Sequence, residues 1–152
     1  MDIEISIPTK IFHLKGIYIF EGLSVSELAA IASVTEVFVY PQGEVVIREG
    51  EPGDTMYLVI DGEVVVIKDY GKDQEIELDR IGAGDYFGEM ALFKGHVRSA
   101  TIRTARQSRL LVLHKREIDE IVREYPQIAL HICEVLSQRI RELHQKIQSY
   151  NR

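Results

Sequence analysis

The clearest structural signal in the chain lies in residues 35–68, whose sequence is TEVFVYPQGEVVIREGEPGDTMYLVIDGEVVVIK. Short runs rich in Val, Ile and Tyr alternate there with turns that contain Gly, Pro or Asp. Such runs predict β-strands, and the turn residues predict tight connections between them. We therefore expect four strands in this stretch, at 36–40, 45–47, 55–60 and 63–68.

The same alternation continues toward the C-terminus. Further strands are expected at 75–81, 99–104 and 109–113, where short apolar runs again follow polar or glycine-containing turns. Many short strands with turns of this kind are typical of an antiparallel sandwich or jelly roll. The predicted fold class is therefore mainly β with flanking helices, with an antiparallel β-roll or jelly roll over about 35–113.

A helical segment is expected before the β-roll, within about 1–34. Ser24 and Glu27 fit a capping box, in which the hydroxyl and the carboxylate each accept a hydrogen bond from a free amide at the helix start. Leu28 and Ile31 then recur at helical spacing. The sequence thus predicts a helix that begins near Ser24.

Two helices are expected after the β-roll, within about 114–150. The first suits 115–123, and Pro126 then opens a second helix that runs to about Tyr150. Apolar residues recur on one face of the second helix at spacings of three and four, and they are Ile128, Ile132, Leu136, Ile140, Leu143 and Ile147. This stripe either packs on the β-roll, or covers a pocket, or pairs with a second copy of the helix.

Composition narrows the class of protein. The chain has 152 residues, 45% of them hydrophobic and 28% charged, which is ordinary for one globular domain, so we expect a single domain over 1–152. The only cysteine, Cys133, cannot form an internal disulfide, which favours a reducing, cytoplasmic location. We interpret Cys133 as a small packing residue. No apolar run approaches the ~20 residues of a spanning helix, so no membrane span is expected.

The charge is unevenly divided along the chain. Residues 1–96 carry a net charge of −11 and residues 97–152 carry +5, which leaves −6 overall. A domain that binds nucleic acid through its whole surface is expected to be strongly basic, so this class is disfavoured. The division raises the question of what the arginines that begin with Arg98 face.

One segment combines features of an anion site. Residues 81–101 read IGAGDYFGEMALFKGHVRSAT, and the turn 89–92 is rich in helix formers after Gly88. Free amides at the start of such a turn favour an anion, and Arg98 adds a bidentate cation. The carboxylate of Glu89 suits donors such as sugar hydroxyls. The pattern predicts a ribose beside a phosphate, and its alternative is an internal salt bridge between Glu89 and Arg98 without a ligand.

The sequence here resembles a known family. The hexapeptide FGEMAL at 87–92 and the tetrapeptide RSAT at 98–101, separated by five residues, are similar to the phosphate-binding cassette of cyclic nucleotide-binding domains. These are the regulatory modules of cyclic-AMP-dependent protein kinase, of cyclic-nucleotide-gated channels and of the bacterial catabolite activator protein. Residues 50–57 and 61–64 also resemble the glycine-punctuated β-roll of the family. The resemblance extends from about Ile17 to the last helix.

The resemblance implies a set of ligand-binding residues. Glu89 would bind the ribose 2′-hydroxyl, and Arg98 would pair with the exocyclic oxygens of the cyclic phosphate. The full set is Gly88, Glu89, Met90, Ala91, Leu92, Arg98, Ser99 and Ala100, in which Ser99 and the amides of Ala91 and Leu92 complete the phosphate shell. In the family the base is often capped from the C-terminal helix, and the candidates here are Arg139, Ile140 and Leu143.

The resemblance also implies a function. We expect a regulatory module, not an enzyme, that binds a cyclic nucleotide and relays it through movement of the C-terminal helices. cAMP is favoured over cGMP, although the residues themselves leave the two open, because the hydroxyl of Ser99 can contact the phosphate or the amino group of a syn guanine. Expected partners are a second copy of the chain, through the C-terminal helix, and an effector domain if the chain is a fragment. No helix-turn-helix follows the last helix, so no DNA-binding domain is expected within these 152 residues.

Two alternatives differ in function. A cupin-like metal enzyme would share a β-roll but would need clustered histidines as metal ligands. The histidines here, His13, His96, His114, His131 and His144, are scattered along the chain without a His-x-His pair, so no metal site and no catalytic cofactor are expected. The other alternative is a family-like fold that makes protein contacts and binds no nucleotide.

Overall fold

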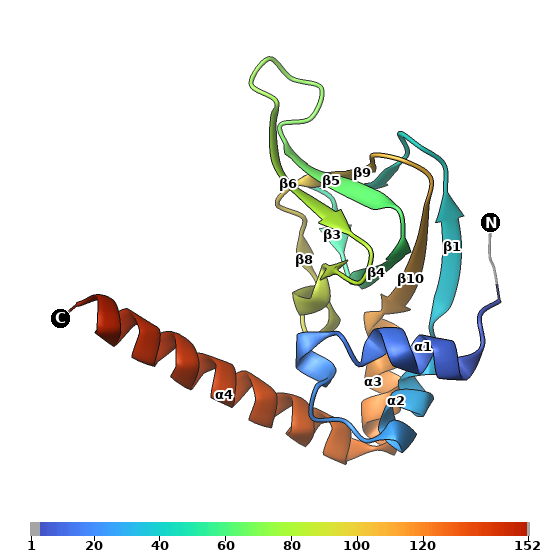
Figure 1. Ribbon diagram of the computed structural model, residues 1–152, viewed down its shortest axis with the longest axis vertical. Helices are drawn as coiled ribbons and strands as arrows, with labels where there is room; N and C mark the ends of the chain where they lie inside the picture. The colour runs from blue at the N-terminus through green and yellow to red at the C-terminus, as the bar shows by residue number, and fades with distance from the viewer. Residues whose placement is uncertain (1–3, 152) are drawn as a thin grey trace.

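The computed structural model describes residues 4–151 and forms a β-roll flanked by helices (Figure 1). The strands are β1 (Glu36–Tyr40), β2 (Val45–Ile47), β3 (Pro52–Gly53), β4 (Thr55–Asp61), β5 (Glu63–Lys68), β6 (Ile76–Gly82), β7 (Tyr86–Phe87), β8 (His96–Val97), β9 (Thr101–Thr104) and β10 (Ser108–His114). The helices are α1 (Ile7–Leu14), α2 (Val25–Ala32), α3 (Lys115–Glu124) and α4 (Pro126–Tyr150), with 3₁₀ turns η1 (Tyr18–Phe20) and η2 (Glu89–Leu92). The predicted mainly β fold with flanking helices is confirmed.

The strands form two antiparallel four-stranded sheets and one short ribbon. The first sheet has the order β1-β10-β4-β7, the second has the order β2-β9-β5-β6, and β3 pairs with β8. All seven strands predicted from the apolar runs are present, with ends that differ by up to two residues. The strands β3, β7 and β8 were not predicted, because two residues are too few to show any alternation.

Two hydrophobic cores lie on opposite faces of the first sheet. Leu110 contributes to a core between the two sheets, whereas its neighbours Leu111 and Leu113 contribute to a core shared with the helices. Successive side chains of a strand point to opposite faces. The continuous apolar run of β10 therefore reflects a strand that is buried on both faces.

Helix α2 begins with the predicted capping box. The carboxylate of Glu27 accepts a hydrogen bond from the amide of Ser24 at 2.9 Å, and the hydroxyl of Ser24 accepts one from the amide of Glu27 at 3.2 Å. Helix α1 was not predicted as a separate element. Like α2, it packs on the core that the first sheet shares with the helices. Its N-cap is Ser6, whose side chain accepts from the amide of Thr9.

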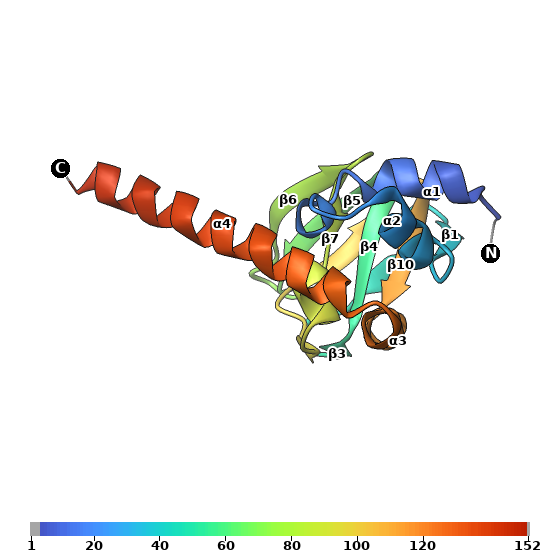
Figure 2. The same ribbon diagram turned by 90° about the horizontal axis from the view of Figure 1, so that it is seen from below.

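Helix α4 packs at its start and projects at its end. Ile128 and Ile132 are buried, whereas Ile140, Leu143 and Ile147 are exposed to 67%, 44% and 59%. Figures 1 and 2 both show the C-terminal half extending away from the β-roll. The apolar stripe therefore packs on the domain from Ile128 to Leu136, over about the first three turns of α4.

The position of Cys133 corrects one expectation. The side chain is exposed on α4, so its interpretation as a packing residue is wrong for this chain. It lies beside Ile132 in sequence but on another face of the helix. Among the described helices, none is both long and apolar enough to cross a bilayer.

Candidate functional site

The predicted cassette forms a loop between the two sheets. Strand β7 leads into Gly88, which has a positive φ of 78°, and η2 follows. A side chain at Gly88 would bring a Cβ to 2.8 Å from the carbonyl oxygen of Thr55 and to 3.0 Å from Nη1 of Arg98. Glycine is thus required here for its backbone conformation and for the close approach of its neighbours.

Arg98 is the central side chain of this loop. It is only 8% exposed, and its Nη2 donates to the carbonyl oxygen of Thr55 at 2.7 Å. A Cβ built on Gly53 would collide with the guanidinium, so the guanidinium passes between two glycines, Gly53 and Gly88. The main chain of Arg98 is held in turn by hydrogen bonds to Gly50 and Glu51, each 2.9 Å long.

The guanidinium of Arg98 is charged and incompletely partnered. Burial lowers its pKa, and the nearby Tyr57 and Asp54 oppose that shift. An arginine guanidinium keeps its proton in proteins, so Arg98 is a cation. Among residues 4–151, its one hydrogen-bond acceptor is Thr55 and it makes no ion pair. A guanidinium has five N–H donors, so this one retains donors for an anion.

A cavity of about 280 Å³ opens beside the cassette. Six of the eight predicted ligand residues line it, and they are Gly88, Glu89, Met90, Arg98, Ser99 and Ala100. Ala91 and Leu92, at the end of η2, do not line it, because their side chains are fully buried. The amide of Ala91 donates to the carbonyl oxygen of Gly88 at 3.1 Å within the turn.

Glu89 and Arg98 lie at the same cavity without pairing. No ion pair joins these two described residues, so the internal salt bridge considered above is not formed in this structure. Acid and base are therefore both available to a bound molecule. A carboxylate beside a guanidinium suits a ligand that carries hydroxyls next to an anionic group.

Five further residues line the cavity beside the cassette and were not predicted from the sequence. Ile47, Val66, Phe87, His96 and Ile102 also line it. Four of them are apolar and come from β2, β5, β7 and β9, so they offer a surface for a flat apolar group such as a nucleobase. Strand alternation marks such positions as buried but does not indicate which of them face a cavity.

The three predicted base-capping residues lie elsewhere in this structure. The guanidinium of Arg139 sits over the ring of Tyr18 at 5.2 Å, and Ile140 and Leu143 are largely exposed. None of the three lines the cavity. Figure 2 shows why: this part of α4 runs away from the strands that carry the cassette.

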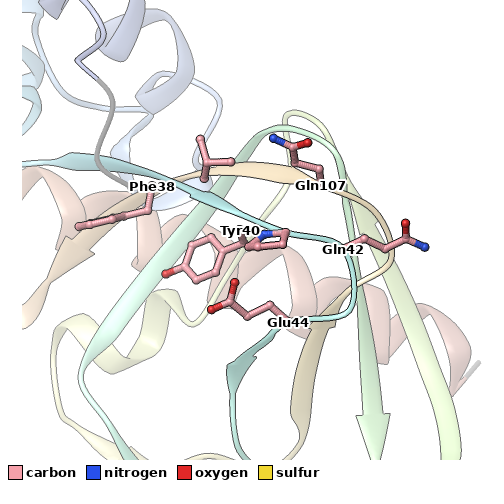
Figure 3. A pocket seen from close by; sticks show the side chains of 7 residues that line it. Phe38, Tyr40, Gln42, Glu44 and Gln107 are labelled. Atoms are coloured by element: carbon pink, nitrogen blue, oxygen red, sulfur yellow. The ribbon is translucent and has the colours of Figure 1, made fainter.

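A larger cavity lies at another place, by the turn between β1 and β2. It measures about 590 Å³, and Figure 3 shows the ring of Tyr40 and the carboxylate of Glu44 lying close together in it. Burial, together with Tyr57 and Glu44, raises the pKa of Tyr40 to about 12. The lining includes no cation that could hold a phosphate, so the smaller cavity at Arg98 is the better candidate for a nucleotide. The larger cavity, beside the turn between β1 and β2, is lined by Phe38, Val39, Tyr40, Pro41, Gln42, Glu44 and Gln107.

The histidines do not converge. Within the described range 4–151, no group of three or more His, Cys, Asp or Glu side chains is arranged to hold a metal ion. His114 and His131 each contact one side chain, Thr55 and Glu27 respectively, in different parts of the molecule.

Comparisons with known proteins identify the family. The family model described as cyclic nucleotide-binding domain matches residues 37–125. The chain is 32% identical over 129 residues to the Cyclic AMP receptor protein of Thermus thermophilus, covering 85% of this chain and 60% of that protein. It is also 32% identical over 130 residues to Cyclic nucleotide-gated channel alpha-4 of Mus musculus, covering 82% of this chain and 22% of the channel.

Solved structures share the architecture. The Catabolite Activator Protein of Thermus thermophilus superposes with a TM-score of 0.67 at 29% identity, over 89% of this chain and 63% of that one. The regulatory domain of Toxoplasma gondii PKA, crystallised with cAMP, superposes with a TM-score of 0.68 at 26% identity, over 90% and 50%. The chain thus spans about 60% or less of the curated relatives named above.

Proposed function

The chain belongs to the cyclic nucleotide-binding domain family, and we propose that it is a regulatory, non-catalytic module whose preferred ligand is cAMP rather than cGMP. One observation carries the proposal: the buried guanidinium of Arg98 retains free donors at an open cavity. A buried charge without a counter-charge is costly, and an anion in the cavity removes that cost. Glu89, at the same cavity, gives the site a second polar contact.

The proposed contacts of the ligand are those that the resemblance to the family implies. Arg98 binds the exocyclic oxygens of the cyclic phosphate, and Glu89 accepts a hydrogen bond from the ribose 2′-hydroxyl. Ser99 and the amides of Ala91 and Leu92 complete the phosphate shell. Because the amide of Ala91 already donates to the carbonyl of Gly88, η2 has to open or share that hydrogen bond when phosphate binds.

The C-terminal helices provide the proposed output. The cavity is open and no residue of α4 lines it, while Ile140 and Leu143 are exposed on α4. We propose that α3 and α4 swing over the base when nucleotide binds, and that Arg139, Ile140 and Leu143 supply the cap. The ligand can bias this movement only through its different affinity for the two states.

The exposed part of the stripe also supports a homodimer. Ile140, Leu143 and Ile147 lie on one face of a helix that projects from the domain, and burying such a face against a second copy is favourable. The curated relatives named above are longer than this chain, so an effector domain in a longer protein is part of the proposal. The location proposed for the module is the cytoplasm.

Calorimetric titration of the chain tests the ligand. We expect saturable binding of one cAMP per chain, weaker binding of cGMP, and little heat with AMP, whose open phosphate carries a different charge and shape. Tighter binding of cGMP would overturn the preference alone. An absence of binding by both cyclic nucleotides would overturn the proposed function.

A further inference from the structure

A buried threonine lies between the cassette and the first C-terminal helix. Thr55 begins β4, is 7% exposed, and its carbonyl oxygen accepts the hydrogen bond from Nη2 of Arg98. Its side chain faces the other way, with Oγ1 at 3.0 Å from Nδ1 of His114. His114 is the residue that caps the start of α3. One residue therefore touches both the arginine and the beginning of the helix.

In the contact between Thr55 and His114, the imidazole ring donates and the hydroxyl oxygen accepts. The hydroxyl of Thr55 has one hydrogen, and it donates to Oδ1 of Asp54 at 3.1 Å. An ionised carboxylate can only accept, so the oxygen of Thr55 is left to accept from the ring of His114. His114 thus carries a hydrogen on Nδ1, and its ring is fixed relative to Thr55.

The backbone makes a second link at the same point. The amide of Lys115, the first residue of α3, donates to the carbonyl oxygen of Asp54 at 2.8 Å. His114 makes no side-chain cap to the amides of α3. The start of α3 is therefore hydrogen-bonded to Asp54 and Thr55 at the beginning of β4. Thr55 is in turn hydrogen-bonded to Arg98.

We propose that Thr55 is a positioning residue that couples phosphate binding at Arg98 to the orientation of α3. This inference rests on the proposed function. When a phosphate engages the guanidinium, Nη2 is drawn away from the carbonyl of Thr55, and the main chain at Asp54 and Thr55 shifts. The hydroxyl carries that shift to the ring of His114, and the carbonyl of Asp54 carries it to Lys115.

The two functions of Thr55 can be separated, because one uses the backbone and the other uses the side chain. Thr55→Val keeps the carbonyl for Arg98 and the β-branched shape of the side chain, but it removes the hydroxyl. Thr55→Ser keeps the hydroxyl and is the matched control. The readout is a thiol-reactive, environment-sensitive fluorophore on Cys133, which is exposed on α4 and is the only cysteine of the chain.

We expect all three proteins to bind cAMP with dissociation constants within about threefold of one another in calorimetry. The cAMP-induced fluorescence change should fall by at least half in Thr55→Val and should be retained in Thr55→Ser. A full fluorescence change in Thr55→Val would overturn the inference, as would an equal loss in Thr55→Ser. If the unsubstituted chain binds no nucleotide, the proposed function fails first and this inference fails with it.

A second variant approaches the same contact from the other side. His114→Phe keeps a ring of similar size and removes the Nδ1 donor, so it serves if Thr55→Val does not fold. It should reproduce the loss of the fluorescence change with affinity within the same threefold limit. An unchanged response in His114→Phe would reject the role of this hydrogen bond.

Discussion

Two side chains of opposite charge are buried to nearly the same extent in different layers of the molecule. Glu27, in the helical layer, is 6% exposed, and Arg98, in the cassette, is 8% exposed. Glu27 accepts hydrogen bonds from the amide of Ser24 at 2.9 Å and from Nδ1 of His131 at 3.1 Å. Arg98 makes no ion pair with any residue of the described range. The buried carboxylate of Glu27 is thus held by hydrogen bonds that join α2 to α4, whereas the buried guanidinium of Arg98 faces the proposed ligand cavity without an ion pair.

Replacing Arg98 tests the unbalanced charge and should have the largest effect. Arg98→Ala is expected to lower cAMP affinity by about 2–5 kcal/mol, roughly 30-fold or more, because the bound phosphate would lose a buried charged partner. The domain should remain folded, since no ion pair is broken. Calorimetry measures the affinity and circular dichroism the thermal midpoint. The exposed Arg106 supplies a matched control as Arg106→Ala, and equal affinities for the two variants would contradict the assignment.

A second change narrows the space around the guanidinium. Gly88→Ala is expected to cost about 1–3 kcal/mol of folding stability, because alanine is strained at positive φ and its Cβ would crowd Thr55 and Arg98. Gly84 also has a positive φ, of 89°, but has open space around it. Gly84→Ala should therefore show the backbone strain alone. Urea unfolding gives both values, and cAMP affinity should fall only for Gly88→Ala; a loss of affinity in both would contradict this explanation.

Glu27 should have the smallest of these effects, which is on the pH dependence of the folding stability. Burial raises the pKa of Glu27, but the hydrogen bonds from Ser24 and the charge of His131 outweigh this, so the pKa is lowered. A lowered folded-state pKa stabilises the fold above the ordinary glutamate value of about 4.3, and this contribution is lost as pH falls through the folded pKa. Glu27→Gln should flatten the fall in the urea midpoint below about pH 4.3. An identical fall in both proteins would show that Glu27 does not contribute to it.

The cassette could be predicted from the sequence because its residues lie close together along the chain. Gly88, Glu89 and Arg98 lie within eleven positions, and their chemistry is evident from residue type alone. Gly53, which makes room for the guanidinium, lies 45 positions away and is brought there by pairing of β3 with β8. A two-residue strand leaves no periodic pattern, so this contact was not predictable.

The helices show the same difference between features set by sequence neighbours and features set by distant residues. The capping box at Ser24 and the start of α4 at Pro126 depend on neighbours in the sequence, and both were predicted. The exposure of Cys133 and the distance of Arg139 from the cavity depend on where α4 points. That direction is set by tertiary contacts of its first turns, including the pair formed by His131 and Glu27, which lie 104 positions apart.

The length of α4 gives it the mechanics of a lever arm. Its 25 residues, at 1.5 Å each, reach about 37 Å from a base that is fixed only over its first turns. A rotation of about 10° at that base would displace the far end by roughly 6 Å, over ten times the sub-ångström shifts that can begin such transitions. A small rotation at the start of α4 therefore gives a displacement that is large enough to change which surface its C-terminal end contacts.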